Sequence, residues 1–149
     1  MNKVILLVED NPDDVELAQL ALRENNMSSE MVVAHDGVEA LDYLFSTGEF
    51  LGRDPCKTPA FVLLDLKLPR LDGLEVLQRM RADNRTKMMP VVVMTSSAEE
   101  SDMVASYRCG ANSYIQKSLD FGCFIEETRQ LGAYWLGLNK VPAPCDESC

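Results

Sequence analysis

The sequence predicts a doubly wound α/β domain, in which helices cover both faces of a parallel sheet. Five short apolar runs recur along the 149 residues, and helical periodicity follows each one. The run from Ala60 to Leu64 is apolar throughout, as in strands that are buried on both faces, and it leads directly into the carboxylate of Asp65. Alternating strands and helices favour a parallel sheet with right-handed crossovers.

The first half of the chain is expected to form two strand–helix pairs. Asn11 and Pro12 are residues that commonly cap and open a helix, and Asp36-Gly37 is typical of a turn before the second helix. The predicted strands are 4–8 and 31–34, and the predicted helices are 12–25 and 38–45.

Residues 47–59 interrupt this rhythm, because they contain two glycines and two prolines. The segment is longer than most connections between a helix and a strand. A functional loop and a tolerated surface insertion both fit.

The second half of the chain is expected to add three strand–helix pairs, after which no periodicity continues beyond Gly137. The predicted strands are 60–64, 91–94 and 113–116, and the predicted helices are 72–82, 99–109 and 121–135. Five parallel strands in a chain of this size favour the flavodoxin-like strand order 2-1-3-4-5.

Composition points to one cytoplasmic domain. The net charge of −10 argues against nucleic-acid partners, which need Lys and Arg to neutralise phosphates. No apolar stretch is long enough for a membrane helix, and no signal peptide is expected. The five cysteines are odd in number and lack metal-ligand spacing, so free thiols in a reducing cytosol are expected.

Polar side chains follow four of the five predicted strands. These residues are Glu9 and Asp10, Asp65, Thr95, and Lys117. Parallel strands bring their carboxyl ends to one edge, so the five side chains should converge. Clustered carboxylates need a cation, and oxygen ligands suit Mg²⁺. Because the lysine and the hydroxyl can bind phosphoryl oxygens, we predict that Asp65 is a nucleophile that accepts a phosphoryl group.

The stretch Asp65-Leu66-Lys67-Leu68-Pro69-Arg70-Leu71-Asp72-Gly73, taken with the residues at the other strand ends, resembles the receiver domain of two-component response regulators. The resemblance covers about residues 3–132. We expect a receiver domain at 1–134 and a C-terminal extension at 135–149. The resemblance implies a signalling protein that catalyses only its own phosphorylation and dephosphorylation.

The resemblance also implies roles for the residues at the strand ends. Glu9, Asp10, Asp65 and the backbone carbonyl of Lys67 would hold Mg²⁺, with Mn²⁺ as a substitute. Asp65 would take the phosphoryl group from a kinase phosphohistidine, and Lys117 would contact that group.

Thr95 and Tyr114 correspond to the switch hydroxyl and the switch aromatic residue of the family. A partly buried structural tyrosine is the alternative for Tyr114. The family usually has proline after the lysine, whereas Ser118 follows Lys117 here. The resemblance therefore implies either a differently shaped loop or a rare cis bond at this position.

The opening residues, the long loop and the segment 134–138 look like the small response regulators that partner cyanobacterial phytochromes. A phytochrome-type sensor histidine kinase is therefore the expected partner. Apolar residues of the last helix and of the tail favour a homodimer through the strand-five/helix-five side and the C-terminal tail, although the tail could instead fold back on its own domain.

The residues argue against three other functions. A binding module that has lost phosphorylation would be expected to lack one member of the set Asp65, Thr95 and Lys117. A phosphatase with an aspartyl-phosphate intermediate typically carries a second Asp where this chain has Lys67. A flavin carrier would need phosphate-binding loops at the first strand end, which holds Glu9 and Asp10 instead.

Overall fold

A computed structural model describes residues 3–25, 29–54 and 56–142. These residues form a five-stranded parallel sheet in the order β2-β1-β3-β4-β5, which confirms the predicted fold class. The strands are β1 (Val4–Val8), β2 (Glu30–Ala34), β3 (Phe61–Leu64), β4 (Val91–Thr95) and β5 (Ser113–Gln116).

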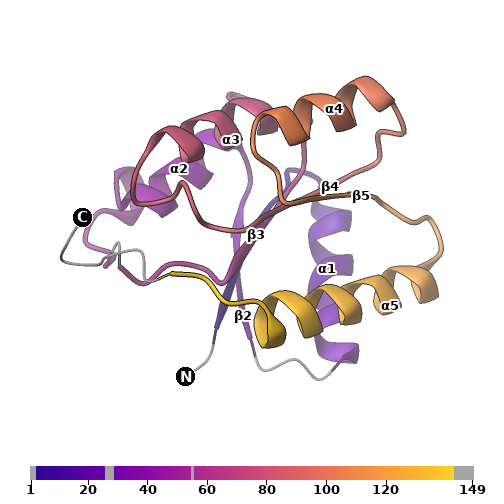
Figure 1. The fold of residues 1–149 in the computed structure, drawn as a ribbon. Helices are drawn as coiled ribbons and strands as arrows, with labels where there is room; N and C mark the ends of the chain where they lie inside the picture. Colours follow the sequence, from indigo (N-terminus) through magenta and orange to yellow (C-terminus); the bar gives the residue numbers. More distant parts are fainter. Residues whose placement is uncertain (1–2, 26–28, 55, 143–149) are drawn as a thin grey trace.

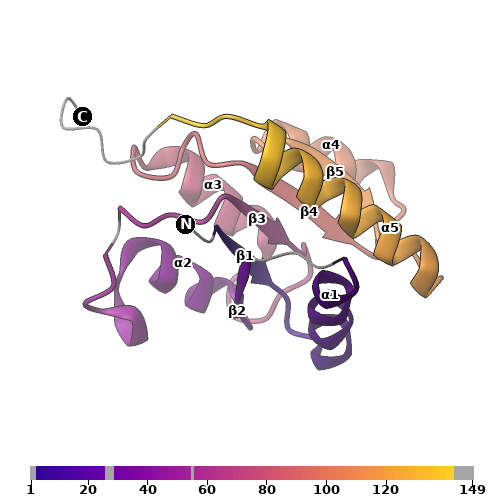
Figure 2. The same cartoon turned by 90° about the horizontal axis from the view of Figure 1, so that it is seen from below.

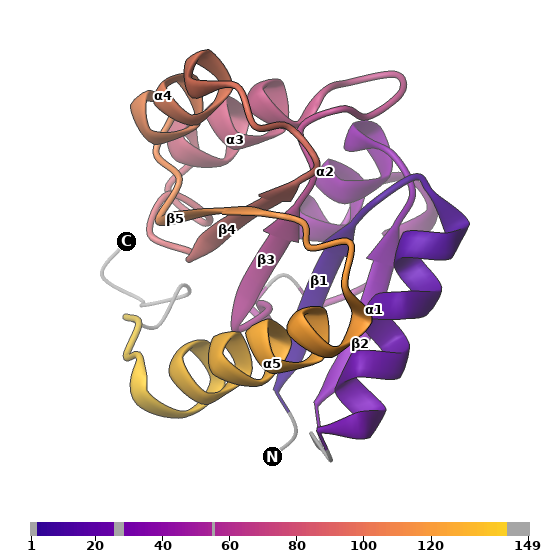
Figure 3. The same ribbon diagram turned by 90° about the vertical axis from the view of Figure 1, so that its right-hand side faces the viewer.

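Five α-helices form the two outer layers of the domain. The helices α2, α3 and α4 cover one face of the sheet, whereas α1 and α5 cover the other (Figures 1 and 3). Figure 2, seen from below, shows α1 and α5 from their own side of the sheet. The helices are α1 (Pro12–Glu24), α2 (Gly37–Phe45), α3 (Gly73–Ala82), α4 (Glu100–Arg108) and α5 (Phe121–Gly132).

The core consists of two clusters, one on each face of the sheet. Because strand side chains alternate between faces, Leu6 and Val8 join the cluster under α2 and α3, while Ile5 and Leu7 join the cluster under α1 and α5. β3 and β4 divide in the same way. This two-sided burial explains why the central strands are uninterrupted apolar runs.

Polar caps begin most helices at fixed positions, often soon after a strand ends. The side chain of Asn11 accepts hydrogen bonds from the backbone N–H groups of Asp13 and Asp14, and Pro12 occupies the first turn of α1. Aspartates cap three other helices in the same manner, at Asp36, Asp72 and Asp120. The caps therefore fix where each chain segment leaves the edge of the sheet.

The segment 47–59 includes one short 3-10 helix, η1 (Gly48–Phe50). The Arg53 guanidinium lies 4.1 Å from the centre of the Tyr43 ring and donates to the backbone carbonyls of Tyr43, Leu44 and Lys57. These contacts attach the segment to the end of α2. The bond to Lys57 also links two parts of the segment to each other.

The C-terminal segment continues α5 into a π-helix, η2 (Ala133–Leu138). The expected single helix through residue 135 therefore changes type after Gly132, because apolar periodicity does not distinguish α from π turns over so few residues. Trp135 and Leu136 pack against the core, and the Trp135 ring lies 6.4 Å from that of Phe61. The Lys3 ammonium donates to the carbonyl of Leu136 at 2.5 Å.

The cysteines differ in part from expectation. Cys109 and Cys123 are free thiols, but Cys56 is disulfide-bonded, so the expectation of free thiols is wrong at that residue. Cys145 and Cys149 lie outside the described residues. In the part of the chain that the structure describes, no helix has the length and hydropathy to cross a bilayer.

Candidate functional site

The parallel register places Glu9 and Asp65 next to each other at one edge of the sheet. Val8 and Leu64 are partners in the pairing of β1 with β3, so the residues that follow them are neighbours. The backbone N–H of Asp65 donates to the carbonyl of Val8 at 3.1 Å. The convergence expected from the sequence therefore follows from strand pairing.

Three carboxylates gather at this edge. Oxygen atoms of Glu9, Asp10 and Asp65 all lie within 4.8 Å of one another. Glu9 and Asp65 are buried, whereas Asp10 is exposed. An all-oxygen set with one open side fits Mg²⁺, which keeps several waters and takes one or two protein carboxylates.

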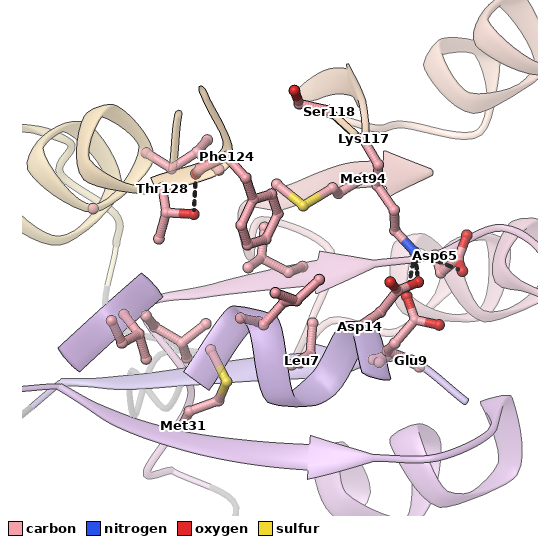
Figure 4. A pocket seen from close by; sticks show the side chains of 18 of the residues that line it. Leu7, Glu9, Asp14, Met31, Asp65, Met94, Lys117, Ser118, Phe124 and Thr128 are labelled. Carbon is pink, nitrogen blue, oxygen red and sulfur yellow. Dashed lines mark hydrogen bonds and ion pairs between the residues drawn. The ribbon is translucent and has the colours of Figure 1, made fainter. Parts of the chain in front are cut away.

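Lys117 joins this cluster from the end of β5. Its ammonium lies 2.5 Å from Glu9 Oε2, 2.9 Å from Asp14 Oδ2 and 3.3 Å from Asp65 Oδ2 (Figure 4). The lysine side chain is only 16% exposed. A largely buried ammonium surrounded by carboxylates is a fixed positive charge beside the Asp65 oxygen.

Asp14 belongs to this site, and the sequence reasoning missed that role. Asp14 is the third residue of α1, and α1 begins four residues after β1 ends. A side chain at that helix position points back over the N-terminus, which was the available signal.

Asn11 connects the helix cap to the acidic cluster. Its side chain caps α1, and its backbone N–H donates to Glu9 Oε1 at 3.1 Å. Glu9 is therefore held at both oxygens, by Asn11 on one and by Lys117 on the other. Asp65 Oδ1 is held by the backbone N–H of Leu66 at 2.7 Å.

Burial changes the ionisation of the cluster. It raises the pKa of the Glu9 carboxyl to about 7, because the hydrogen bond from Lys117 offsets only part of the desolvation and the Asp65 charge adds to it. Burial lowers the pKa of Lys117, but hydrogen bonds to Asp14 and Glu9 outweigh it, so the net shift is upward. Lys117 therefore stays charged at neutral pH.

The expected switch residues lie on β4 and β5. Thr95 is fully buried, its carbonyl accepts from the backbone N–H of Lys117 at 2.7 Å, and its hydroxyl accepts from the backbone N–H of Ser97. The Tyr114 hydroxyl donates to the Ser97 carbonyl at 3.1 Å. Both side chains therefore contact the β4–α4 loop at the same residue.

Two loops complete the edge. Lys67 is exposed in the β3–α3 loop, two residues after Asp65. A Cβ added to Gly73 would lie 2.2 Å from the Asp65 carbonyl oxygen, so only glycine fits at that point. None of the described residues has a cis peptide bond, and the loop with Lys117 and Ser118 is therefore shaped by a trans bond.

Comparison with known proteins agrees with this geometry. The chain matches the response regulator receiver domain over residues 5–129. Response regulator Rcp1 of Synechocystis sp. is 36% identical over 141 residues, which are 95% of this chain and 94% of Rcp1. Its Mn²⁺-bound structure has a TM-score of 0.84 at 36% identity and covers 95% of this chain and 99% of that one.

Two further solved structures are similar along nearly the whole chain. The phosphorylated cyanobacterial phytochrome response regulator RcpA has a TM-score of 0.87 at 37% identity, with coverage of 95% of this chain and 99% of that one. The bacteriophytochrome response regulator AtBRR has a TM-score of 0.75 at 48% identity, with coverage of 94% and 99%. With the family matched over most of its length, the chain belongs to the response regulator receiver domain family.

Proposed function

We propose that this chain accepts a phosphoryl group on Asp65 from the phosphohistidine of a histidine kinase, in a reaction that needs Mg²⁺ or Mn²⁺. An Asp65 oxygen attacks phosphorus, the bond from phosphorus to the imidazole nitrogen breaks, and the imidazole leaves with that electron pair. The product is an acyl phosphate. The chain acts as a signalling receiver that catalyses only its own phosphorylation and dephosphorylation.

The observation that carries this proposal is that Asp65 belongs to the acidic cluster and lies beside the fixed positive charge of Lys117. Lys117 lies 3.3 Å from Asp65 Oδ2, where it can bind an incoming phosphoryl oxygen. The Leu66 N–H holds the other oxygen, so the carboxylate is oriented before the donor arrives. The Thr95 hydroxyl would donate a hydrogen bond to another phosphoryl oxygen.

The metal would be held by Glu9, Asp10 and Asp65, with the Lys67 carbonyl as a further oxygen ligand. When bound, it would neutralise the charge of the carboxylates and of the transferred group. Asn11 and Lys117 fix Glu9 for this purpose, since each donates to one of its oxygens. The bound Mn²⁺ of the related Rcp1 structure supports a divalent cation as the cofactor.

The proposed output is protein contact or onward phosphotransfer. Thr95 and Tyr114 both contact Ser97, so a phosphoryl group that draws Thr95 toward Asp65 would move the β4–α4 loop and release the Tyr114 hydroxyl. The altered surface would lie over α4 and β5.

The proposed kinase is a phytochrome-type sensor in the cytoplasm. This choice is supported by RcpA, a cyanobacterial phytochrome response regulator, and by AtBRR, a bacteriophytochrome response regulator. We further propose a receiver unit at 1–134 and an extension at 135–149 that contributes to a symmetric homodimer with the β5/α5 side. Apolar side chains exposed on that side support the dimer: Leu119, Phe121, Tyr134 and Leu138.

Mass spectrometry after incubation with acetyl phosphate and Mg²⁺ tests the phosphoryl transfer. The wild-type chain should gain one phosphoryl group, and chelator should prevent the gain. Asp65→Asn should stay unmodified and folded, because the amide is nearly isosteric and removes one of several repelling charges. Asp13→Asn is the matched control, since Asp13 is exposed on α1 and should be labelled normally. Full labelling of the Asp65 variant would refute the assignment.

A further inference from the structure

A cavity of about 230 Å³ lies between the sheet and the helices α1 and α5. It extends from the acidic edge, where Glu9 and Lys117 contribute to its lining, to the opposite edge, where Met31 and Leu131 do. Figure 4 shows Leu7, Met94 and Phe124 along it between these ends. The cavity therefore has one charged end and a long apolar wall.

The cavity is large enough for a small organic group. Protein interiors are close-packed and contain few voids larger than a water molecule. An engineered apolar cavity of about 150 Å³ binds benzene. The cavity here exceeds that volume, so one aromatic ring with a short chain would fit between α1 and α5.

The charged end selects the sign of the head group. Glu9, Asp14 and Asp65 face a single ammonium, that of Lys117, which already contacts all three carboxylates. The carboxylates outnumber the ammonium, and Asp10 adds another negative charge beside them. An anionic head would meet this excess of negative charge, whereas a cationic head would be attracted to it.

We propose that the cavity binds a small hydrophobic cation, of the arylalkylammonium class, with its ring between α1 and α5 and its ammonium at Asp14 and Glu9. Because Glu9 and Asp65 also form the cluster suited to a divalent cation, the ammonium and Mg²⁺ exclude each other. The site is therefore a point at which an amine could antagonise metal binding. The binding itself does not depend on phosphorylation of Asp65.

Titration with three matched probes tests the charge preference. Phenethylammonium, phenethyl alcohol and phenylacetate carry the same ring with a cationic, neutral or anionic end. Trp135 is the sole tryptophan, and its ring lies 6.4 Å from Phe61, which lines the cavity, so its fluorescence is the readout. The cation should bind at least about tenfold more tightly than the anion. Equal affinities, or a preference for phenylacetate, would overturn the proposal.

Variants and competition test the location. Ala18 lines the cavity and is 6% exposed, so Ala18→Leu should fill the space and abolish binding. Ala105→Leu on α4, on the other face of the sheet, is the control and should bind normally. Asp14→Asn should weaken binding of the cation but not of phenethyl alcohol, and excess Mg²⁺ should displace the cation.

Retained affinity in a folded Ala18→Leu chain, or indifference to Mg²⁺, would refute the site. Should that variant not fold, NMR shifts in the wild-type chain decide the question. Phenethylammonium should perturb resonances of Leu7, Met94 and Phe124, and perturbations confined to other regions would contradict the assignment.

Discussion

At the scale of single residues, Asp14 is the side chain whose role depends most on three-dimensional placement. Its carboxylate lies 2.9 Å from the Lys117 ammonium but is not one of the three clustered metal-binding candidates. It is also the most exposed of the three carboxylates that contact the lysine, at 34%. In the proposed reaction, Asp14 would therefore compete with the incoming phosphoryl group for Lys117 without serving as a metal ligand.

Asp14→Asn should raise the rate of phosphorylation by acetyl phosphate severalfold. The substitution removes a negative charge from the region that an anionic donor must approach, and it leaves the ammonium more available to phosphoryl oxygens. The rate is measured by the appearance of the phosphorylated mass at fixed Mg²⁺. Asp13→Asn, in the same turn but exposed, is the control for helix-terminus effects and should react like wild type. A slower reaction of the Asp14 variant would show that Asp14 positions Lys117 instead.

At the scale of elements, a single arginine attaches α3 to the segments that lead into β4 and β5. The Arg81 guanidinium is half-buried and makes hydrogen bonds to four backbone carbonyls and one side-chain amide. Its partners are Thr86, Lys87, Met89, Gly110 and Asn112. Only a planar group with several donors can serve such a set.

Arg81→Lys should lower the free energy of unfolding by about 2 kcal/mol, because most of these carbonyls lose their donor. Arg79→Lys in the same helix is the control. Arg79 is exposed and forms a long ion pair with Glu75, at 3.6 Å, so its replacement should change stability by less than about 0.5 kcal/mol. Urea denaturation of both variants measures the difference. Equal stabilities of the two variants would mean that a lysine can replace the guanidinium of Arg81.

The start of α3 is the second place where one residue controls an element. Gly73→Ala should destabilise the chain by about 1–3 kcal/mol and slow phosphorylation, because the new Cβ would lie 2.2 Å from the Asp65 carbonyl oxygen and displace it. Gly137→Ala is the control, since no atom lies within 4 Å of its added Cβ. Thermal unfolding and labelling rates test both effects. A Gly73 variant with wild-type stability and rate would contradict the close approach.

At the scale of the whole molecule, the C-terminal segment has two kinds of apolar side chain. Trp135 and Leu136 pack on the core, so the alternative in which the tail folds back holds for these residues. Tyr134 and Leu138 are 47% and 71% exposed. Residues 143–149 of the proposed extension lie outside the described part of the chain. The exposed pair, and not the packed pair, is the part available to a second copy.

We expect the full chain to sediment as a dimer at micromolar concentration and the double variant Tyr134→Ser, Leu138→Ser to sediment as a monomer. Leu51→Ser is the control, because Leu51 is 81% exposed in the segment after α2, away from α5. Point variants are preferable to truncation at Gly132, which would also remove the core contacts of Trp135. A monomeric wild-type chain, with and without acetyl phosphate, would exclude the dimer.

The sequence alone predicted the strand order and which residues lie at the strand ends. Uninterrupted apolar runs mark buried parallel strands, and parallel pairing brings their ends together whatever their separation in the chain. Asp14 and the cavity escaped prediction because both depend on how α1 and α5 pack on the sheet. The π turns of η2 and the disulfide at Cys56 escaped for a related reason, since neither leaves a periodic signal.

The bond from Lys3 to the carbonyl of Leu136 joins the start of β1 to the C-terminal segment, at the edge of the sheet opposite the carboxylates. The proposed kinase would reach Asp65 at one end of β3, whereas the tail is tied to Lys3 beyond the other end, about 13 Å away along a strand of four residues. The proposed dimer surface spans both ends, because Leu119 and Phe121 follow Lys117 at the acidic edge. A second copy bound there would lie along α5 from the tail to the phosphorylation site, so docking of the kinase and pairing of two copies would share that edge of the sheet.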